Sequence, residues 1–301
     1  MTKPEKAVSR ARAKAPSGFM DYMDRLVDAA LSEDAGTGDI TTGSIVGPAD
    51  RGRAEMVARE SFVLAGLFVA EKVFKHIDRK VVFKSDFSDG DLIRKGSVIA
   101  TVSGRLSTLL TGERVALNFL QRLSGIATLT AEFVKKTGKT GARILDTRKT
   151  TPCLRPLERY AVRVGGGENH RFGLFDRLLI KDNHIKVAGG VTEAVRRAKD
   201  NTSGSTPIEV EVTNQRELKE ALAAGADIIM LDNMSLDRIK KAVRLIGGAA
   251  FTEVSGGVSL QSVGAIARTG VDFISVGALT HSARAVDISM KVVSYGNKRG
   301  R

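Results

Sequence analysis

The sequence of 301 residues contains no tryptophan, three tyrosines and one cysteine, Cys153. One cysteine cannot form a disulfide within the chain, and together with four histidines it cannot build a cysteine-rich zinc module. The longest apolar stretch, residues 61–70, has about ten residues, whereas a membrane-spanning helix needs roughly 20. We therefore expect a cytoplasmic protein without a membrane span.

Acidic residues are fewer than basic ones, 34 against 47, which gives a formal net charge of +13. Such an excess is typical of nucleic-acid-binding proteins. Here the basic residues are spread along the whole chain, and the scarcity of tryptophan and tyrosine leaves few rings for bases to stack on. Within residues 143–186, lysine and arginine outnumber aspartate and glutamate two to one. We therefore predict a small polyanionic ligand and no nucleic acid.

The chain is long enough for two domains, and 42% of its residues are hydrophobic. Residues 1–16 are basic and lack an apolar run, so we expect a disordered tail and no secretory signal. Residues 17–130 mix both kinds of secondary structure. Periodicity predicts helices over 19–32, 65–77 and 106–136, with strands over 54–58, 81–87 and 98–102.

Residues 131–301 have a different pattern, in which short apolar strands alternate with amphipathic helices. This alternation predicts a parallel sheet. The strands are expected over 143–146, 178–181, 208–212, 227–231, 250–254 and 272–276. Each strand ends on polar residues or glycine, and in parallel barrels the active site is built from those ends. The pattern therefore favours a barrel with one polar mouth.

The polar strand ends combine cations, acids and glycine turns. Arginine and lysine there could receive phosphates or carboxylates. Glu211 and Asp232 could hold a divalent cation or ribose hydroxyls, and the glycine turns at 255–257 and 276–278 could cradle a phosphate through backbone N–H groups. A single charged strand end is more often half of a structural ion pair. The coincidence of several such ends is what favours a site.

Other motifs exclude familiar enzyme classes. The segment 138–140 imitates the end of a P-loop, but the upstream glycine is missing, and the glycines at 165–167 lack dinucleotide-binding spacing. No serine lies in a nucleophile elbow, and there is no His-Glu-x-x-His pair. A serine hydrolase and a zinc protease are therefore excluded. We interpret His76 as structural and Cys153 as inert.

Several longer motifs carry a family resemblance. They are Ile-Leu-Asp-Thr-Arg-Lys-Thr-Thr-Pro at 144–152, Gly-Gly-Gly-Glu-Asn-His-Arg at 165–171, Leu-Ile-Lys-Asp-Asn-His-Ile at 179–185, Leu-Asp-Asn at 231–233 and Val-Gly-Ala-Leu-Thr-His-Ser at 276–282. With them the chain resembles the quinolinate phosphoribosyltransferase family over nearly its whole length, apart from residues 1–16. One departure is Cys153, where the family usually has glycine.

The resemblance implies an N-terminal α/β sandwich over 17–130, on which the C-terminal end of the chain could pack back, and an incomplete TIM-like α/β barrel over 131–301. The implied reaction joins quinolinate and phosphoribosyl pyrophosphate (PRPP) to give nicotinate mononucleotide, pyrophosphate and carbon dioxide, with Mg²⁺, in de novo NAD biosynthesis. A homodimer with shared active sites is implied as the smallest unit, and a hexamer stays open.

The resemblance also assigns roles to single positions. The two quinolinate carboxylates would be received by Arg148, His170 and Arg171, with Arg114 contributed by the partner subunit. Lys149 and Lys181 would lie near the pyrophosphate and the pyridine carboxylate, and Glu211 and Asp232 near the ribose and its metal. The remaining implied substrate contacts, mostly at the 5′-phosphate, are Thr147, Ser255, Gly256, Gly257, Val276, Gly277, Ala278 and His281.

Chemistry supports three of these residues as catalytic: Lys149, Glu211 and Asp232. Departure of pyrophosphate leaves an oxocarbenium-like centre, which carboxylates stabilise while cations hold the leaving charge. Two alternatives remain. A related molybdenum-locus protein departs from the Lys-Asp-Asn-His motif at 181–184, and a basic binding protein without catalysis would have no need for Glu211 and Asp232 among its cations.

Overall fold

The computed structural model describes residues 18–202 and 206–296, so the expected tail at 1–16 lies outside the described residues. Contacts within the chain divide these residues into two compact units. One comprises residues 18–128 with 283–296, and the other comprises 129–202 with 206–282. The sequence suggested a boundary at residue 130 and a barrel over 131–301, with the C-terminal end able to pack back on the sandwich. In the structure the chain returns to the first unit after Ser282.

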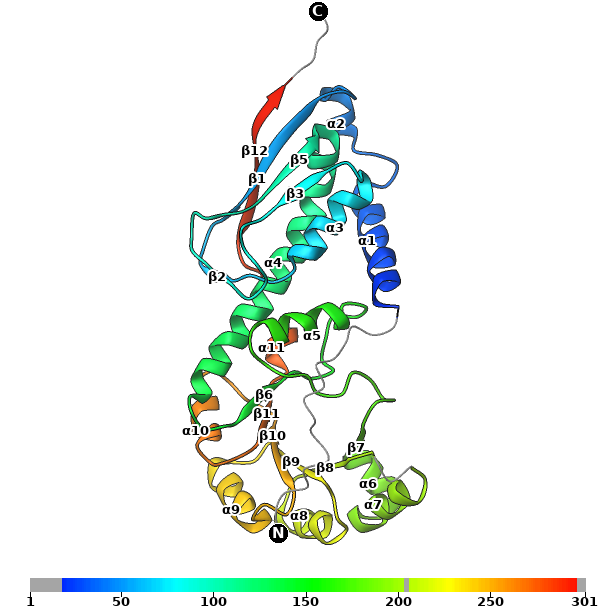
Figure 1. The fold of residues 1–301 in the computed structure, drawn as a ribbon. Helices are drawn as coiled ribbons and strands as arrows, with labels where there is room; N and C mark the ends of the chain where they lie inside the picture. Colours follow the sequence, from blue (N-terminus) through cyan, green and yellow to red (C-terminus); the bar gives the residue numbers. More distant parts are fainter. Residues whose placement is uncertain (1–17, 203–205, 297–301) are drawn as a thin grey trace, which may run out of the picture. The chain divides into compact units, whose positions relative to one another are not determined.

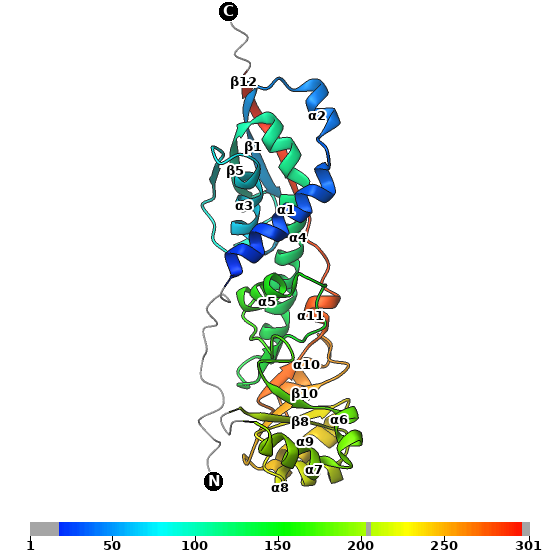
Figure 2. The same cartoon turned by 90° about the vertical axis from the view of Figure 1, so that its right-hand side faces the viewer.

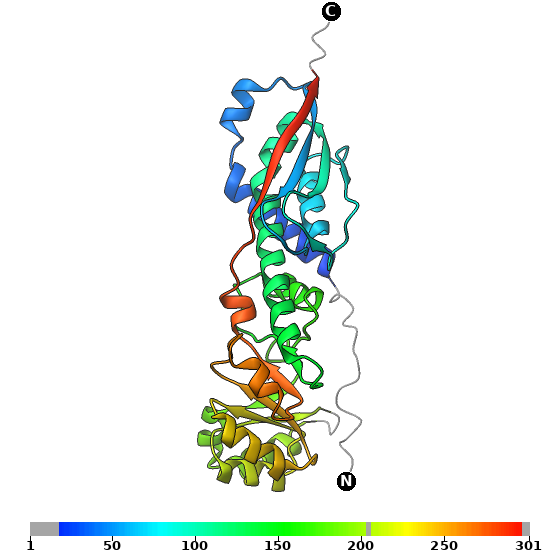
Figure 3. The same ribbon diagram turned by 90° about the vertical axis from the view of Figure 1, so that its left-hand side faces the viewer.

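The first unit contains the helices α1 (Phe19–Ala35), α2 (Ile40–Ile45), α3 (Leu67–Ile77) and the first part of α4 (Leu106–Thr137). Its strands are β1 (Arg51–Ala58), β2 (Phe62–Val63), β3 (Val82–Lys84), β4 (Leu92–Ile93), β5 (Val98–Arg105) and β12 (Ile288–Gly296). Four of them form an antiparallel sheet in the order β12-β1-β5-β3, and β2 pairs with β4. Helices α1, α3 and α4 lie on one face of the larger sheet (Figures 1 and 3).

Buried apolar side chains between the helices and the sheet hold this sandwich together. Helix α3 buries Val69, Ala70, Val73 and Phe74, whose spacing of three and four residues places them on one helix face. Strand β1 buries alternate residues from Ala54 to Ala58, as expected for a strand with one face against a core. The expected helices and strands of residues 17–130 are present, although the sequence did not predict α2, β2 or β4 as separate elements.

The C-terminal return has backbone and side-chain support. Strand β12 pairs antiparallel with β1, with Ile288 opposite Ala58. Before it, Gly125 on α4 comes so close to the segment that a Cβ there would lie 2.0 Å from the carbonyl oxygen of Arg284, a contact that only glycine permits. The C-terminal end of the chain therefore belongs to the sandwich, because it supplies strand β12 of the four-stranded sheet.

A carboxylate clamp holds the start of this return. Glu60 accepts two hydrogen bonds from the guanidinium of Arg284 and one from the backbone N–H of Asp287, the last at 2.8 Å. The side-chain hydrogen bonds from Arg284 and the backbone bond from Asp287 lower the pKa of Glu60 from 4.5 to about 2. Bidentate arginine–carboxylate pairs are stronger than ordinary surface pairs.

We expect Glu60→Gln to lower the free energy of unfolding by about 1 kcal/mol at pH 7, measured by urea denaturation. Because the folded-state pKa is depressed, this stabilisation is present above about pH 4.5 and is lost as the pH falls toward 2. Glu55→Gln is the matched control, since Glu55 pairs with Arg53 on β1 through one hydrogen bond, at a slightly less exposed position than Glu60. Equal effects of both variants would contradict a special role for the clamp.

The second unit is built around a six-stranded parallel sheet in the order β6-β11-β10-β9-β8-β7 (Figures 1 and 2). Its strands are β6 (Arg143–Leu145), β7 (Leu178–Ile180), β8 (Ile208–Val212), β9 (Ile228–Asp232), β10 (Phe251–Ser255) and β11 (Phe273–Ser275). All six coincide with strands expected from the sequence. Strands β6 and β7 are the two edges, so the barrel is incomplete, in agreement with the predicted fold class.

Helices follow most of these strands. They are α5 (Arg155–Val164), α6 (Asp182–Ala188), α7 (Val191–Asp200), α8 (Gln215–Ala223), α9 (Leu236–Ile246), α10 (Val263–Ala267) and α11 (Ala278–His281). The Asn214 side chain caps α8 by accepting the backbone N–H groups of Arg216 and Glu217. Glu217 accepts hydrogen bonds from the backbone N–H and the hydroxyl of Thr213, which ties the residue before the cap to the first turn of the helix. In the described part of the chain, no helix has the length and hydropathy needed to span a membrane.

Candidate active site

A pocket of about 770 Å³ lies at the carboxyl ends of the parallel strands. The parallel register explains why polar side chains meet there: Asp232 ends β9 directly opposite Ser255, which ends β10. Fourteen of the sixteen substrate-binding residues predicted from the sequence line it: Thr147, Arg148, Lys149, His170, Arg171, Lys181, Glu211, Asp232, Ser255, Gly256, Gly257, Gly277, Ala278 and His281. The pocket therefore brings together most of the polar residues expected at the mouth.

Two predicted residues do not line this pocket. Val276 is buried behind it. Arg114 lies on α4 in the other unit, where it is exposed. Conversely, the sequence analysis assigned no site role to five further residues that line the pocket, which are Leu179, Met230, Asn233, Val258 and Ser275.

Lys181 and Glu211 form an ion pair on neighbouring strands. Lys181 Nζ lies 2.5 Å from Glu211 Oε2, and the Glu211 side chain is 12% exposed. The backbone N–H of Lys181 donates to Nδ1 of His184 at 2.9 Å. This bond fixes the turn from β7 into α6, so the Lys-Asp-Asn-His motif orients its lysine through its histidine.

The turn after β9 explains two of the sequence motifs together. Asn233 has a positive φ of 50°, donates from Nδ2 to Asp232 Oδ2 at 2.9 Å and donates its backbone N–H to the carbonyl of Ser255. A Cβ on Gly256 would lie 2.3 Å from Oδ1 of Asn233, and Gly256 itself has φ +91°. Only glycine fits this position. Its neighbour Gly257 also has a positive φ, of 59°, and successive turn residues of this kind can present N–H groups to an anion.

A second glycine lies where Lys149 crosses the pocket. A Cβ on Gly277 would lie 3.1 Å from both the Lys149 side chain and Nε2 of His281. The hydroxyl of Thr280 on α11 donates to the carbonyl oxygen of Lys149 at 2.8 Å. The Thr280 hydrogen bond therefore ties the loop that carries Lys149 to the turn after β11. Gly277, which has no Cβ, leaves room for the Lys149 side chain.

Cys153 is the position where the sequence departs from the resembling family. It is exposed and has a φ of 61°, a conformation that costs an L-residue with a Cβ roughly 1–2 kcal/mol. The family's usual glycine avoids that cost. We expect Cys153→Gly to raise the free energy of unfolding by about 0.5 kcal/mol in urea denaturation, after the entropy that glycine loses on folding. Cys153→Ala, which retains the Cβ, is the control, and a glycine variant no more stable than it would contradict the argument.

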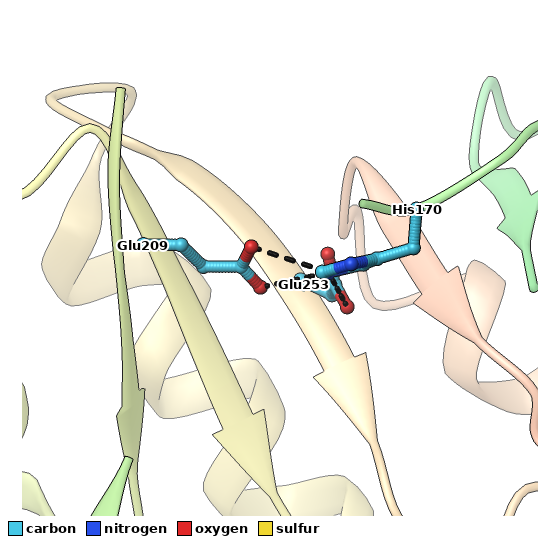
Figure 4. A group of neighbouring side chains, drawn as sticks. All are labelled: His170, Glu209 and Glu253. Carbon is cyan, nitrogen blue, oxygen red and sulfur yellow. Dashed lines mark hydrogen bonds and ion pairs between the residues drawn. The ribbon is translucent and has the colours of Figure 1, made fainter. Parts of the chain in front are cut away.

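His170 contributes to the pocket wall in an unexpected way. Its Nε2 lies 3.2 Å from the carboxylate of Glu209 and 3.5 Å from that of Glu253 (Figure 4). Its Nδ1 accepts the backbone N–H of Arg171 at 2.8 Å. Both ring nitrogens are thus engaged by the protein. The sequence assigned His170 to a substrate carboxylate, and the structure gives both of its ring nitrogens protein partners while it lines the pocket.

The two glutamates around His170 were missed as site residues. Glu209 and Glu253 are 0% and 1% exposed. Burial and the charge of Glu253 raise the pKa of Glu209 above its ordinary value. The available signal was an acidic residue inside an apolar strand, two positions before a mouth residue: Glu209 precedes Glu211, and Glu253 precedes Ser255. Side chains two apart on a strand share a face, so both glutamates had to point into the barrel.

Two carboxylates at the mouth have the chemistry to hold Mg²⁺. Glu211 and Asp232 both line the pocket and offer hard oxygen ligands. Among the described residues, the one group of three potential protein ligands is His170 with Glu209 and Glu253, so these two form no all-protein cage. Magnesium is usually held by one or two carboxylates together with substrate phosphates and water. The residues present therefore fit a magnesium ion that arrives with a phosphorylated substrate.

Comparisons with known proteins agree with this geometry. The chain matches the model of the quinolinate phosphoribosyl transferase N-terminal domain over residues 39–124 and that of the C-terminal domain over 126–291. It is 46% identical over 270 residues to the probable nicotinate-nucleotide pyrophosphorylase (carboxylating) of Bacillus subtilis, covering 90% of this chain and 93% of that one. It is 41% identical to the chloroplastic nicotinate-nucleotide pyrophosphorylase of Arabidopsis thaliana, covering 93% and 85%.

Solved structures give the same result. NadC from Streptococcus pyogenes superposes with a TM-score of 0.90 at 43% identity, covering 95% of this chain and all of that one. The nicotinate-nucleotide pyrophosphorylase of Francisella tularensis gives a TM-score of 0.87 at 45% identity, with 90% and 96% covered. The two family models, the sequence relatives and the solved structures therefore all match both the sandwich and the barrel. The chain belongs to the quinolinate phosphoribosyltransferase family.

Proposed function

We propose that this pocket transfers the phosphoribosyl group of PRPP to the ring nitrogen of quinolinate, with loss of pyrophosphate and then of carbon dioxide, giving nicotinate mononucleotide for NAD biosynthesis. The observation that carries the proposal is the Arg171 guanidinium. Arg171 is 6% exposed and lines the pocket, yet its Nε has no hydrogen-bond partner among the described residues. A buried unpaired donor costs about 1–3 kcal/mol, which a bound carboxylate would recover.

The surroundings of Arg171 favour an anion with more than one charge. Burial and the nearby Arg148 lower the pKa of the Arg171 guanidinium, because two cations near each other destabilise one another. A dicarboxylate between them relieves this repulsion. Guanidinium groups can each bind a carboxylate through two hydrogen bonds, so the pair would hold the pyridine ring in one orientation, which brings its nitrogen in line with the ribose carbon.

Other residues of the pocket lining would serve the sugar phosphate. Asp232 and Glu211 line the pocket, and their carboxylates would stabilise a developing oxocarbenium charge at the ribose. Lys149 and Lys181 would take the charge of the departing pyrophosphate, and the 255–257 turn would hold the 5′-phosphate. When bound through Glu211 and Asp232, Mg²⁺ would supply further neutralisation of the phosphate charge.

The family resemblance implies a shared site, to which a second chain would contribute Arg114. Arg114 is exposed on α4 in the sandwich unit, whereas the pocket lies entirely in the barrel unit. We infer that the homodimer brings the Arg114 of one chain to the pocket of another, as the family resemblance implies. A cytoplasmic location belongs to the same proposal and is supported by the single cysteine of the sequence, which cannot form a disulfide within the chain.

The activity test uses the full-length protein with quinolinate, PRPP and Mg²⁺, with nicotinate mononucleotide measured by chromatography. We expect product only when all three are present, and loss of turnover when EDTA removes the metal. Nicotinate in place of quinolinate is the matched control, because it lacks the second carboxylate that Arg148 and Arg171 would share. Absence of product, or equal use of nicotinate, would refute the proposed reaction.

A further inference from the structure

The barrel interior beneath the pocket contains a buried group of ionisable side chains. Glu209 on β8, Glu253 on β10 and His170, from the segment between α5 and β7, are 0%, 1% and 6% exposed. Barrel interiors are ordinarily filled by branched apolar residues, and buried charges are costly unless they are paired. Two carboxylates and one imidazole at this position therefore require an explanation beyond packing.

The three side chains converge on one ring nitrogen (Figure 4). Nε2 of His170 lies 3.2 Å from Glu209 and 3.5 Å from Glu253. Ser275 on β11 donates to the Oε1 atom of Glu253 at 2.5 Å, which fixes that carboxylate from the far side. Toward an ionised carboxylate, which only accepts hydrogen bonds, Nε2 is the donor. The ring plane of His170 is therefore set by two strands of the barrel.

The other edge of the imidazole determines where Arg171 begins. Nδ1 accepts the backbone N–H of Arg171 at 2.8 Å. The backbone N–H of His170 donates to Asp146 at 2.8 Å, and its carbonyl accepts from Arg159 at 2.7 Å. Two hydrogen bonds therefore fix the backbone of His170, and a third, to its own imidazole, fixes the backbone N–H of Arg171.

The guanidinium of Arg171 makes few hydrogen bonds of its own. Among the described residues, its one side-chain hydrogen bond is a long one, 3.3 Å from Nη1 to the carbonyl oxygen of Arg177. Its Nε has no partner there. A long flexible side chain with weak anchoring at its end depends on its backbone for direction, and fixed rotamers are what orient a binding group. The hydrogen bond from the Arg171 backbone N–H to the His170 imidazole provides such a restraint.

We propose that Glu209, His170 and Glu253 form a positioning unit that directs the Arg171 guanidinium toward the substrate carboxylate. The proposal rests on the proposed function for the identity of that carboxylate. None of the three residues needs to touch substrate, because the two glutamates act on His170 and His170 acts on the Arg171 backbone. A metal ion is the alternative occupant of the group, since the three ligand atoms lie within 4.8 Å of one another.

The variants Glu209→Gln and Glu253→Gln preserve side-chain shape while weakening the acceptors of His170. We expect each to raise the Kd of quinolinate about tenfold, equivalent to about 1.4 kcal/mol, by isothermal titration calorimetry. The Kd of PRPP should stay within about twofold. Asp272→Asn is the matched control, because Asp272 bonds to Thr252 across β10 and β11 at the opposite ends of these strands. It lowers stability without reaching the pocket.

A double-mutant cycle separates positioning from general damage. In an Arg171→Lys background, Glu253→Gln should change quinolinate affinity less than about twofold, because the side chain that it positions is gone. A full tenfold effect in that background, or a parallel loss of PRPP affinity, would overturn the proposal. One equivalent of metal in the purified protein, lost in Glu253→Gln, would overturn it in favour of a metal site.

A ligand-free measurement keeps the proposal independent of the reaction. With ¹⁵N-labelled arginine, the Nε–H signal of Arg171 can be assigned by its disappearance in Arg171→Lys. We expect a dispersed, slowly exchanging signal in the free protein, broadened in Glu253→Gln and unchanged in Asp272→Asn. A signal unaffected by Glu253→Gln would refute the positioning unit even if the enzyme is active, and a wild-type protein that binds quinolinate without forming product would refute only the proposed function.

Discussion

Arg171→Ala is expected to lower kcat/KM for quinolinate on the order of 10²- to 10³-fold, with a change below about threefold in KM for PRPP. Hydrogen bonds to charged groups contribute roughly 1.5–3 kcal/mol each, and the buried guanidinium has Nε free for one of them. The loss falls on quinolinate because the residues placed at the sugar phosphate, such as Asp232, come from other strands. Steady-state kinetics with each substrate varied in turn would measure both values.

Arg171→Lys and Arg148→Lys give the controls for this experiment. Lysine keeps the charge but cannot form a planar fork, so Arg171→Lys should retain more activity than alanine and less than wild type. Arg148 is exposed, and its replacement by lysine should lower quinolinate binding by about 1–3 kcal/mol. Equal losses for both substrates in Arg171→Ala would show that the pocket has collapsed, and unchanged quinolinate affinity in either arginine variant would contradict its assigned role.

The parallel sheet could be predicted strand by strand because its signals are local. Each strand is a short apolar run bounded by a turn, and glycines such as Gly225, with φ +75°, end the helix before the next strand. A strand whose last residue is polar, such as β9 ending at Asp232, also indicates where the mouth lies. These features depend on neighbours within a few residues, so they can be read from the sequence.

The return of the C-terminal strand could be suspected but not located from local pattern. Strand β12 pairs with β1, more than 200 residues earlier in the chain, and nothing near Ile288 specifies that partner. Its burial pattern also gives little help, since most of its residues are exposed. Pairing over such a separation depends on the assembled sheet and on contacts such as Glu60 with Arg284.

The site shows a similar limit. Most residues expected at the mouth line one pocket, because their motifs are long and end the parallel strands. The protein partners of the His170 ring could not be predicted, since a motif does not show which side chains pack against it. Glu209 and Glu253 come from strands 44 residues apart, and only the register of the folded barrel places both carboxylates against one imidazole.

The second large effect concerns Arg114 and requires two chains. We expect Arg114→Ala and Lys149→Ala each to reduce kcat on the order of 10²-fold or more, because each removes a cation from the site of a highly charged substrate pair. If the site is shared, a dimer with one chain of each kind has one complete site: the pocket of the Arg114→Ala chain with the arginine of the other. Random exchange should then restore about one quarter of wild-type activity.

The matched control mixes Lys149→Ala with Glu211→Gln. Both residues line the same pocket, so each hybrid dimer retains one defective pocket of each kind and no activity should return. Native mass spectrometry of the mixtures would establish that subunits have exchanged. Recovery in the first mixture alone is explained only by a site composed of two chains, whereas no recovery after demonstrated exchange would place Arg114 outside the site and leave its exposed position on α4 to a purely surface role.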